Sequence, residues 1–439
     1  MTEVTQIAFT LAVATVVLLI YILFKILTKP NEKQTEETID KEIIEEEQVK
    51  QVQKPKEKKI NLKTVPKVKE STFKHNWLAS SLKAHSDNVT GIDFSSNGKY
   101  FVSCGLDRAI FLWSTKEFEL HQHKSIRCNV EFDHATKIKF SPDSKSFIVS
   151  LGVSNTIRAF KIVKKEDSNI QILPATVQDF PQKHKADLIN IGISCNGKFI
   201  MTCSKDTTVN IWNLKGDILG TIDTRLGNNS FACVSQCGRF FGVCGFTPDV
   251  KIWEVAFDKT DNFKEIKRAF ELKGHSAGVY SFAFNADSTR MVSVSKDKTW
   301  KLWNTNIDYE RGQDASLLLT ISVDEKGPSL IAISPDSYSV AVTVNNKLYF
   351  YNGLNGECDQ VIDNIFNDSV TELMFSSDNK YLSVAGDRHV KIFKNITGHK
   401  VAVQDLESQI KNAKTQGAKE RIEQQIQEHK KYIENLAAN

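Results

Sequence analysis

A histidine, a hydroxyl residue and an aspartate recur along this chain at a fixed spacing, and such side chains can form a hydrolytic triad. Counted from His275, Ser293 follows after 18 positions, Asp297 after 22 and Trp303 after 28. A Ser-His-Asp set acts on a substrate only when the serine is exposed beside donors that stabilise an oxyanion. The spacing therefore raises a hydrolase hypothesis, which has to be weighed against a structural role.

The same spacing occurs three times, which favours the structural role. A catalytic set is needed once, whereas a repeated set indicates a repeated structural unit. Each unit holds short runs in which apolar and polar residues alternate, broken by turn residues, as is typical of antiparallel strands. The three sets are His85, Ser103, Asp107 and Trp113; His184, Thr202, Asp206 and Trp212; and His275, Ser293, Asp297 and Trp303.

The stretch Leu272–Asn304 opens on Gly-His and closes near a Trp, and in this it resembles a repeat of the WD40 family. The resemblance implies a hydrogen-bonded chain in each such unit, from Trp to Ser/Thr to His to Asp, which would satisfy buried polar groups. One departure concerns function. No Trp of the repeats is followed by Asp, so the Trp-Asp-x-Arg element of ubiquitin-ligase receptors is absent.

Weaker repeats lie between the three complete ones and keep the closing aromatic residue. Adjacent closing aromatics are 41 to 52 residues apart, which brackets the usual repeat period. The pattern predicts an all-β fold, a seven-bladed WD40 propeller over residues 73–396. The closing residues are Trp113, Phe160, Trp212, Trp253, Trp303, Tyr351 and Phe393.

A ring of sheets has to close, because an open sheet edge invites aggregation. The run Leu78–Lys83 resembles an outer strand, yet no earlier blade precedes it. We expect it to pair with the last blade, between Tyr381 and Phe393, so that the two ends of the propeller domain hold each other.

Residues 1–29 are predicted to form an N-terminal transmembrane anchor. Ile7–Phe24 contains eighteen residues without a charge, with Glu3 before it and Lys25 and Lys29 after it. A cleavable secretory signal would have basic residues before the apolar run, which favours a retained single-pass helix. The positive flank predicts that the bulk of the chain faces the cytosol.

Residues 30–72 are predicted to be a disordered charged tether. Eight acidic residues lie between Glu32 and Glu47, and eight lysines lie between Lys50 and Lys69. The lysine block is either a solvated spacer or a contact for anionic lipid or RNA. The candidate contacts are Lys50, Lys54, Lys56, Lys58, Lys59 and Lys63.

The remaining sequence features do not indicate a catalytic or metal site. All eight cysteines lie in the repeat region with no shared offset, which predicts buried free thiols rather than disulfides. No motif supports a catalytic, metal or cofactor site, so we expect none. In residues 397–439 apolar positions recur every three or four residues on either side of Gly417, which predicts a short helical tail that packs on the propeller or pairs with a partner helix.

The order of parts resembles a membrane-anchored branch of the WD40 family, the transducin beta-like branch. The likeness is specific in segments such as IDFSSNGKY (92–100), GKFIMTCSKDTTVNIW (197–212) and RAFELKGHSAGVYSFAF (268–284). It implies a non-enzymatic scaffold of the endoplasmic reticulum membrane that docks proteins, including a stress-sensor kinase, in stress signalling or translation control. An RNA- or ribosome-binding adaptor and a location in the mitochondrial outer membrane stay open as alternatives.

Overall fold

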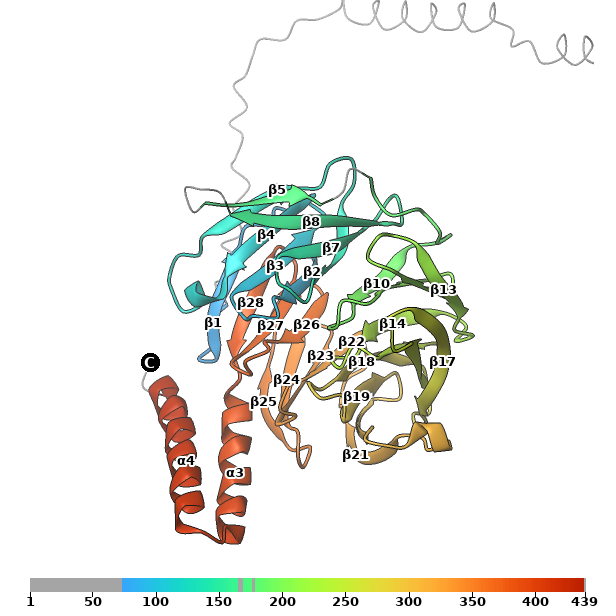
Figure 1. Cartoon of the computed structure of the whole chain (residues 1–439). Coiled ribbons are helices and arrows are strands. Elements are labelled where there is room, and N and C mark those ends of the chain that lie inside the picture. The colour runs from blue at the N-terminus through green and yellow to red at the C-terminus, as the bar shows by residue number, and fades with distance from the viewer. Residues whose placement is uncertain (1–72, 165–168, 176–177, 438–439) are drawn as a thin grey trace, which may run out of the picture. The chain divides into compact units, whose positions relative to one another are not determined.

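A computed structural model describes residues 73–164, 169–175 and 178–437 of the chain. These residues belong to one compact unit, in which seven four-stranded sheets are arranged as a β-propeller (Figure 1). The predicted anchor and tether, residues 1–72, lie outside the described residues. Within the described part of the chain, no helix combines the length and apolarity that a membrane crossing requires.

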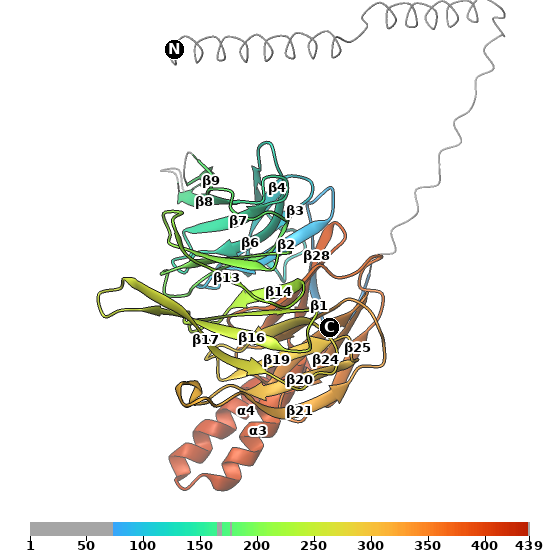
Figure 2. The same ribbon diagram turned by 90° about the vertical axis from the view of Figure 1, so that its right-hand side faces the viewer.

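The sheets are numbered here as blades 1 to 7. Blade 1 contains β2 (Val89–Phe94), β3 (Tyr100–Gly105), β4 (Ala109–Ser114) and β5 (Ser125–Asn129). Blade 2 contains β6 (Ala135–Phe140), β7 (Ser146–Leu151), β8 (Ile157–Lys164) and β9 (Ile170–Pro174). Blade 3 contains β10 (Leu188–Ile193), β11 (Ile200–Ser204), β12 (Thr208–Trp212) and β13 (Ile218–Asp223). Blade 4 contains β14 (Asn229–Val234), β15 (Phe240–Gly245), β16 (Val250–Phe257) and β17 (Phe263–Leu272), and its outer hairpin protrudes from the ring (Figure 2).

The other three blades complete the ring. Blade 5 contains β18 (Val279–Phe284), β19 (Arg290–Ser295), β20 (Thr299–Asn304) and β21 (Ser316–Ser322). Blade 6 contains β22 (Ser329–Ile333), β23 (Ser339–Val344), β24 (Lys347–Asn352) and β25 (Cys358–Ile362). Blade 7 contains β26 (Glu372–Phe375), β27 (Tyr381–Gly386), β28 (His389–Lys394) and β1 (Leu78–Lys83). Two short 3-10 helices, η1 (Thr115–Glu117) and η2 (Tyr309–Arg311), lie in connections of blades 1 and 5.

The ring closes as the sequence predicts. Strand β1 is the outer strand of blade 7 and pairs antiparallel with β28, with Leu82 opposite Val390. Trp77, just before β1, packs edge-on against Phe350 of blade 6 with ring centroids 5.0 Å apart. The N-terminal strand therefore covers an edge that β28 would otherwise expose.

The closing aromatics explain why the blades pack. Each lies in the third strand of its blade and is buried, and each pairs with a residue at the start of the preceding strand, as Trp303 does with Met291. A blade sheet is covered by neighbours on both faces, so β19 has five consecutive buried residues, 291–295. The seven side chains belong to β4, β8, β12, β16, β20, β24 and β28 in turn: Trp113, Phe160, Trp212, Trp253, Trp303, Tyr351 and Phe393.

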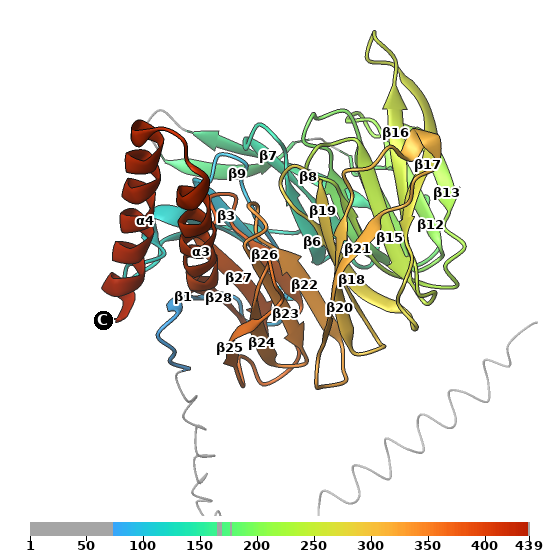
Figure 3. The same ribbon diagram turned by 90° about the horizontal axis from the view of Figure 1, so that it is seen from below.

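The C-terminal tail forms a helical hairpin of α3 (Ile396–Asn412) and α4 (Gln416–Ala437), which lie side by side in Figures 1 and 3. The break between them precedes Gly417, which is the second residue of α4 and does not separate the two helices as the sequence suggested. Helix α3 packs on blade 6, where Tyr338 donates a hydrogen bond to Asp405 (2.7 Å). The apolar stripe of the tail thus packs within this chain.

All eight cysteines are free. Cys104, Cys203 and Cys244 are buried, as predicted for structural thiols, Cys128, Cys233 and Cys237 are half-buried, and Cys195 and Cys358 are exposed. The prediction of burial was wrong for these two because Cys195 lies in the hairpin turn after β10 and Cys358 begins the outer strand of blade 6, where no neighbouring blade covers it.

Candidate functional site: the tetrad face

One end of the propeller collects the polar residues singled out in the sequence. It is formed by the leading loop of each blade, which precedes the first strand, and by the middle turn, which joins the second strand to the third. His85, His184 and His275 lie in leading loops, and their aspartates lie in the middle turns. We call this end the tetrad face.

Blade 5 brings its four residues into one chain of hydrogen bonds. The indole Nε1 of Trp303 donates to Ser293 Oγ (2.9 Å), and Ser293 Oγ lies 2.8 Å from His275 Nε2. His275 Nδ1 lies 2.9 Å from a carboxylate oxygen of Asp297, which also accepts from the backbone N–H of Ser276 (3.0 Å). The chain joins the leading loop to the middle turn through the buried centre of the blade.

Blade 1 has the same geometry. Trp113 Nε1 donates to Ser103 Oγ (3.1 Å), which lies 2.9 Å from His85 Nε2. His85 Nδ1 lies 3.0 Å from Asp107, whose carboxylate accepts from the N–H of Ser86 (2.9 Å).

Blade 3 departs from this pattern. Trp212 and His184 meet at Thr202 Oγ1 (2.9 and 2.7 Å), but His184 Nδ1 lies 3.6 Å from Asp206 and instead contacts Thr208 Oγ1 at 2.9 Å. The hydroxyl of Thr208 donates to Asp206 and completes the link. A threonine occupies the same offset in blade 5, Thr299, whereas blade 1 has Ala109 there. A threonine 24 positions after the histidine is therefore the sequence feature that could have predicted the additional member of the hydrogen-bonded chain, Thr208.

The electrostatics favour neutral imidazoles. Burial lowers the pKa of His275 below its usual value, and Asp297 only partly offsets this; the same holds for His85 with Asp107. A neutral ring whose Nδ1–H donates to the aspartate leaves Nε2 to accept from the serine hydroxyl. Ser103 and Ser293 are fully buried, with their oxygens engaged by Trp and His, so neither can meet a substrate.

Blades without the full set tie the same two segments by other means. In blade 7, Asp387 of the middle turn accepts from the N–H groups of Asn367 (2.9 Å) and Asp368 (3.2 Å) in the leading loop. In blade 4, Thr247 takes the aspartate position, and its hydroxyl is buried with no hydrogen-bond partner among the described residues.

Blade 2 reverses the arrangement and presents an aromatic side chain. Asp133 lies in the leading loop and accepts from Val153 N–H, Ser154 N–H (both 2.9 Å) and Ser154 Oγ (2.8 Å) of the middle turn. Its neighbour Phe132 is 92% exposed and has a φ of 62°, which is unfavourable for a bulky residue. Arg158 fixes the same loop by donating to the carbonyl of Glu131 (3.0 Å).

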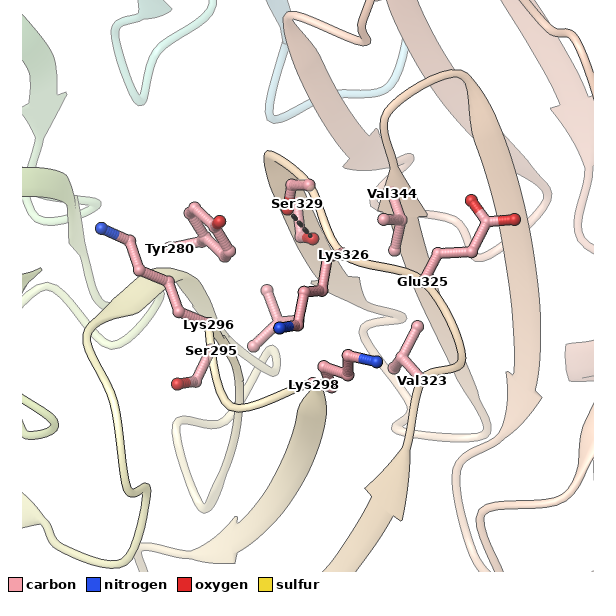
Figure 4. Close-up of a pocket in the computed structure, with 11 residues that line it drawn as sticks. Tyr280, Ser295, Lys296, Lys298, Val323, Glu325, Lys326, Ser329 and Val344 are labelled. Atoms are coloured by element: carbon pink, nitrogen blue, oxygen red, sulfur yellow. Dashed lines mark hydrogen bonds between the residues drawn. The ribbon is translucent and has the colours of Figure 1, made fainter.

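A cavity of about 200 Å³ opens between blades 5 and 6 on the tetrad face (Figure 4). The middle turn of blade 5 supplies Lys296 and Lys298, and the leading loop of blade 6 supplies Glu325 and Lys326. Tyr280, Val323 and Val344 form apolar parts of the wall. In Figure 4, Lys298 and Lys326 lie near each other, Lys296 points away from them beside Tyr280, and Glu325 lies on the other side of Lys326.

Sequence reasoning found the tetrads and missed this cavity and Phe132. It assigned anion contacts instead to Lys50, Lys54, Lys56, Lys58, Lys59 and Lys63, all of which lie outside the described residues. The only signal for the cavity in the sequence is the alternation Ser295-Lys296-Asp297-Lys298, in which an inward-facing aspartate is flanked by two lysines.

The fold and the three tetrads define a WD40-repeat propeller, and comparison with known proteins agrees. The WD domain, G-beta repeat, matches residues 76–114, 177–213, 266–304 and 356–394. Three of the four matches join the outer strand of one blade to three strands of the next, so the repeat is offset from the blade by one strand; the match over 177–213 begins after β9.

Two curated relatives resemble nearly the whole chain. Transducin beta-like protein 2 of Mus musculus is 47% identical over 374 residues, which cover 85% of this chain and 84% of the relative. The Homo sapiens protein of that name is 46% identical over 375 residues, with the same coverage. A more distant relative, the periodic tryptophan protein 2 homolog of Dictyostelium discoideum, is 23% identical over 233 residues. The chain belongs to the transducin beta-like protein 2 family.

Proposed function

We propose that this protein is a non-enzymatic scaffold that holds a WD40 propeller beside a membrane and docks other proteins on its tetrad face. Phe132 carries the proposal. Its left-handed backbone costs about 1–3 kcal/mol, and such strain persists only where the surroundings impose it. Here Asp133 and Arg158 hold the loop, and the result is an exposed aromatic side chain on a fixed backbone, the type of residue that dominates protein interfaces.

The membrane part of the proposal rests on sequence. Ile7–Phe24 is uncharged and is followed by lysines, which supports a single-pass anchor with the propeller in the cytosol. The family resemblance supports the endoplasmic reticulum, and with it a role in stress signalling or translation control beside a stress-sensor kinase. The mitochondrial outer membrane is the alternative location.

Proximity labelling tests the docking function, with a labelling enzyme fused to the C-terminus of the full chain. We expect cytosolic neighbours that are lost in Phe132→Asp and kept in Leu214→Asp. Leu214 is a matched control because it is exposed and lies between β12 and β13, at the opposite end of the propeller. Purely lumenal neighbours would overturn the topology, and equal losses in both variants would overturn the assignment to Phe132.

A second candidate function is an RNA- or ribosome-binding adaptor that acts through the tether lysines and the propeller surface. The lysine block between Lys50 and Lys69 favours it, because binding to a phosphate backbone needs clustered cations. Such binding should weaken steeply with salt and on charge reversal of Lys54, Lys56 and Lys58. Insensitivity to both would reject this function.

A further inference from the structure

The cavity between blades 5 and 6 is lined by three lysines and by one acidic residue, Glu325. Among the described residues, Lys296, Lys298 and Lys326 form no ion pair, although acidic residues are close in sequence. Asp297 is occupied by His275 and by the N–H of Ser276. Glu325 pairs with Lys347, which also lies 3.3 Å from Asp363. The three ammonium groups are therefore available to an outside anion.

The tetrad fixes the turn that presents two of these lysines. Because Asp297 points inward to His275, the residues on either side of it point outward. Lys298 has a φ of 63°, and its carbonyl accepts a hydrogen bond from the N–H of Val323 (2.8 Å), which joins the turn to the leading loop of blade 6. Two walls of the cavity are thus held in place before any ligand arrives, which lowers the entropic cost of binding.

Aromatic and apolar side chains accompany the lysines. The ammonium of Lys296 lies 5.6 Å from the ring centroid of Tyr280 and 6.0 Å from that of Phe246, a residue that is 71% exposed. Val323 and Val344 line the cavity behind them. A ligand that fits has to combine negative charge with an apolar group.

We propose that this cavity, the blade 5–6 pocket, binds an acidic segment of a partner protein. One carboxylate or phosphoryl group would lie beside Lys298 and Lys326, a second beside Lys296, and a neighbouring apolar side chain would contact Tyr280 and Val323. The proposal rests on the docking function above and assigns it a site. A nucleic acid fits less well, because its bases bind mainly by stacking on aromatic side chains, whereas Val323 and Val344 of this wall are aliphatic.

The test is fluorescence anisotropy with the full chain in detergent micelles at fixed ionic strength. The probes are a labelled Glu-Glu-Leu-Glu-Glu-Phe-Glu-Glu peptide, its Gln version, a version with phosphoserine for two glutamates, and a labelled oligouridine. We expect the acidic peptides to bind and the Gln version not to bind. Comparison of the glutamate and phosphoserine versions shows which anion the lysines prefer.

Charge reversal of Lys296, Lys298 and Lys326 to Glu should weaken peptide binding roughly tenfold or more. A matched control reverses Lys99, Lys116 and Lys145, which are exposed at the opposite end, and should leave binding unchanged.

Equal weakening in both triple variants, or none in the first, would overturn the pocket while leaving the Phe132-dependent neighbours intact. Oligouridine binding that depends on the three lysines, without peptide binding, would overturn the ligand class. If neutralisation of the acidic residues between positions 32 and 47 makes the peptide bind more tightly, these residues compete with the peptide for the pocket. The ligand would then be a segment of this chain, and the proposal of a partner protein would be wrong.

Discussion

Blades 5 and 2 solve one structural problem with different chemistry. In blade 5 the aspartate lies in the middle turn and reaches the leading loop through His275 and the N–H of Ser276. In blade 2 the aspartate lies in the leading loop and accepts from two N–H groups and a hydroxyl of the middle turn. The difference teaches that different residues can link the loop to the turn, and that the His-Ser-Asp-Trp set is one of several ways to make this link.

Within one turn of blade 5, neighbouring residues have different roles, one structural and the others in binding. Asp297 faces the interior and holds the blade together, whereas Lys296 and Lys298 face outward into the blade 5–6 pocket. In blade 2 the inward residue is Asp133 and the outward one is Phe132. In both blades, a buried aspartate positions a neighbour that is exposed for binding.

The largest expected effect is the loss of the closing strand. Deletion of Leu78–Lys83 leaves the edge of β28 unpaired and should lower the free energy of unfolding by more than about 5 kcal/mol, a large part of the stability of an ordinary domain. Circular dichroism during thermal unfolding measures it. Deletion of α4 is the control, since it leaves all seven sheets complete. An unchanged unfolding temperature without β1 would show that the ring does not depend on this strand.

The next effect concerns the tetrad of blade 5. Ser293→Ala leaves Trp303 Nε1 and His275 Nε2 without their shared partner, so it should lower the free energy of unfolding by about 1–3 kcal/mol. Denaturant titration measures this, with Ser322→Ala on an exposed strand as the control. A change as small as that of the control would contradict a structural role.

The link in blade 2 should matter as much as the tetrad. Asp133→Ala removes the acceptor of several hydrogen bonds from the middle turn, and we expect a loss of about 1–3 kcal/mol in the same titration. It should also release Phe132 from its left-handed conformation and weaken capture of the neighbours that depend on Phe132. A stable Asp133→Ala variant with unaltered docking would contradict the claim that Asp133 has the same role in blade 2 as Asp297 has in blade 5.

The smallest effect is a dependence on pH. Burial lowers the pKa values of His85, His184 and His275 below 6.5, so the folded state keeps these rings neutral where the unfolded chain takes up protons. Stability should therefore be constant above pH 6.5 and fall as the pH drops through 6.5 towards the folded-state values. Unfolding titrations at pH 7.5 and 5.5 measure it. His275→Gln should make the decline shallower, and a steeper decline would contradict the assignment.

The sequence predicted the parts of the fold that depend on local patterns. Alternation and the closing aromatics located the blades, and the unpaired run Leu78–Lys83 predicted the closure, because each follows from strand geometry. The position of the helix break was wrong. Gly417 lies in the first turn of α4, where the first N–H groups have no partner within the helix and glycine costs less. Thr415 precedes α4 and accepts from the N–H of Ala418 (3.4 Å), which is an ordinary start signal.

The binding surface was less accessible to prediction. Lys296 and Lys326 lie 30 positions apart in the sequence and on different blades, and only the ring brings them to one cavity. Phe132 reads as an ordinary apolar residue in a loop, since neither its exposure nor its φ is encoded in a local pattern. The role of Asp133 was hidden for the same reason, because its partners are the N–H groups of a distant turn.

The central claim is that the buried, hydrogen-bonded residues of the tetrad face hold the blades together, whereas the exposed residues beside them bind the partner. The most direct test measures stability and affinity for the acidic peptide in two variants, Ser293→Ala and the triple charge reversal of Lys296, Lys298 and Lys326. The account predicts that the first loses stability and keeps affinity at a temperature where it is folded, while the second keeps stability and loses affinity. Loss of affinity in a folded Ser293→Ala, with stability unchanged, would contradict it.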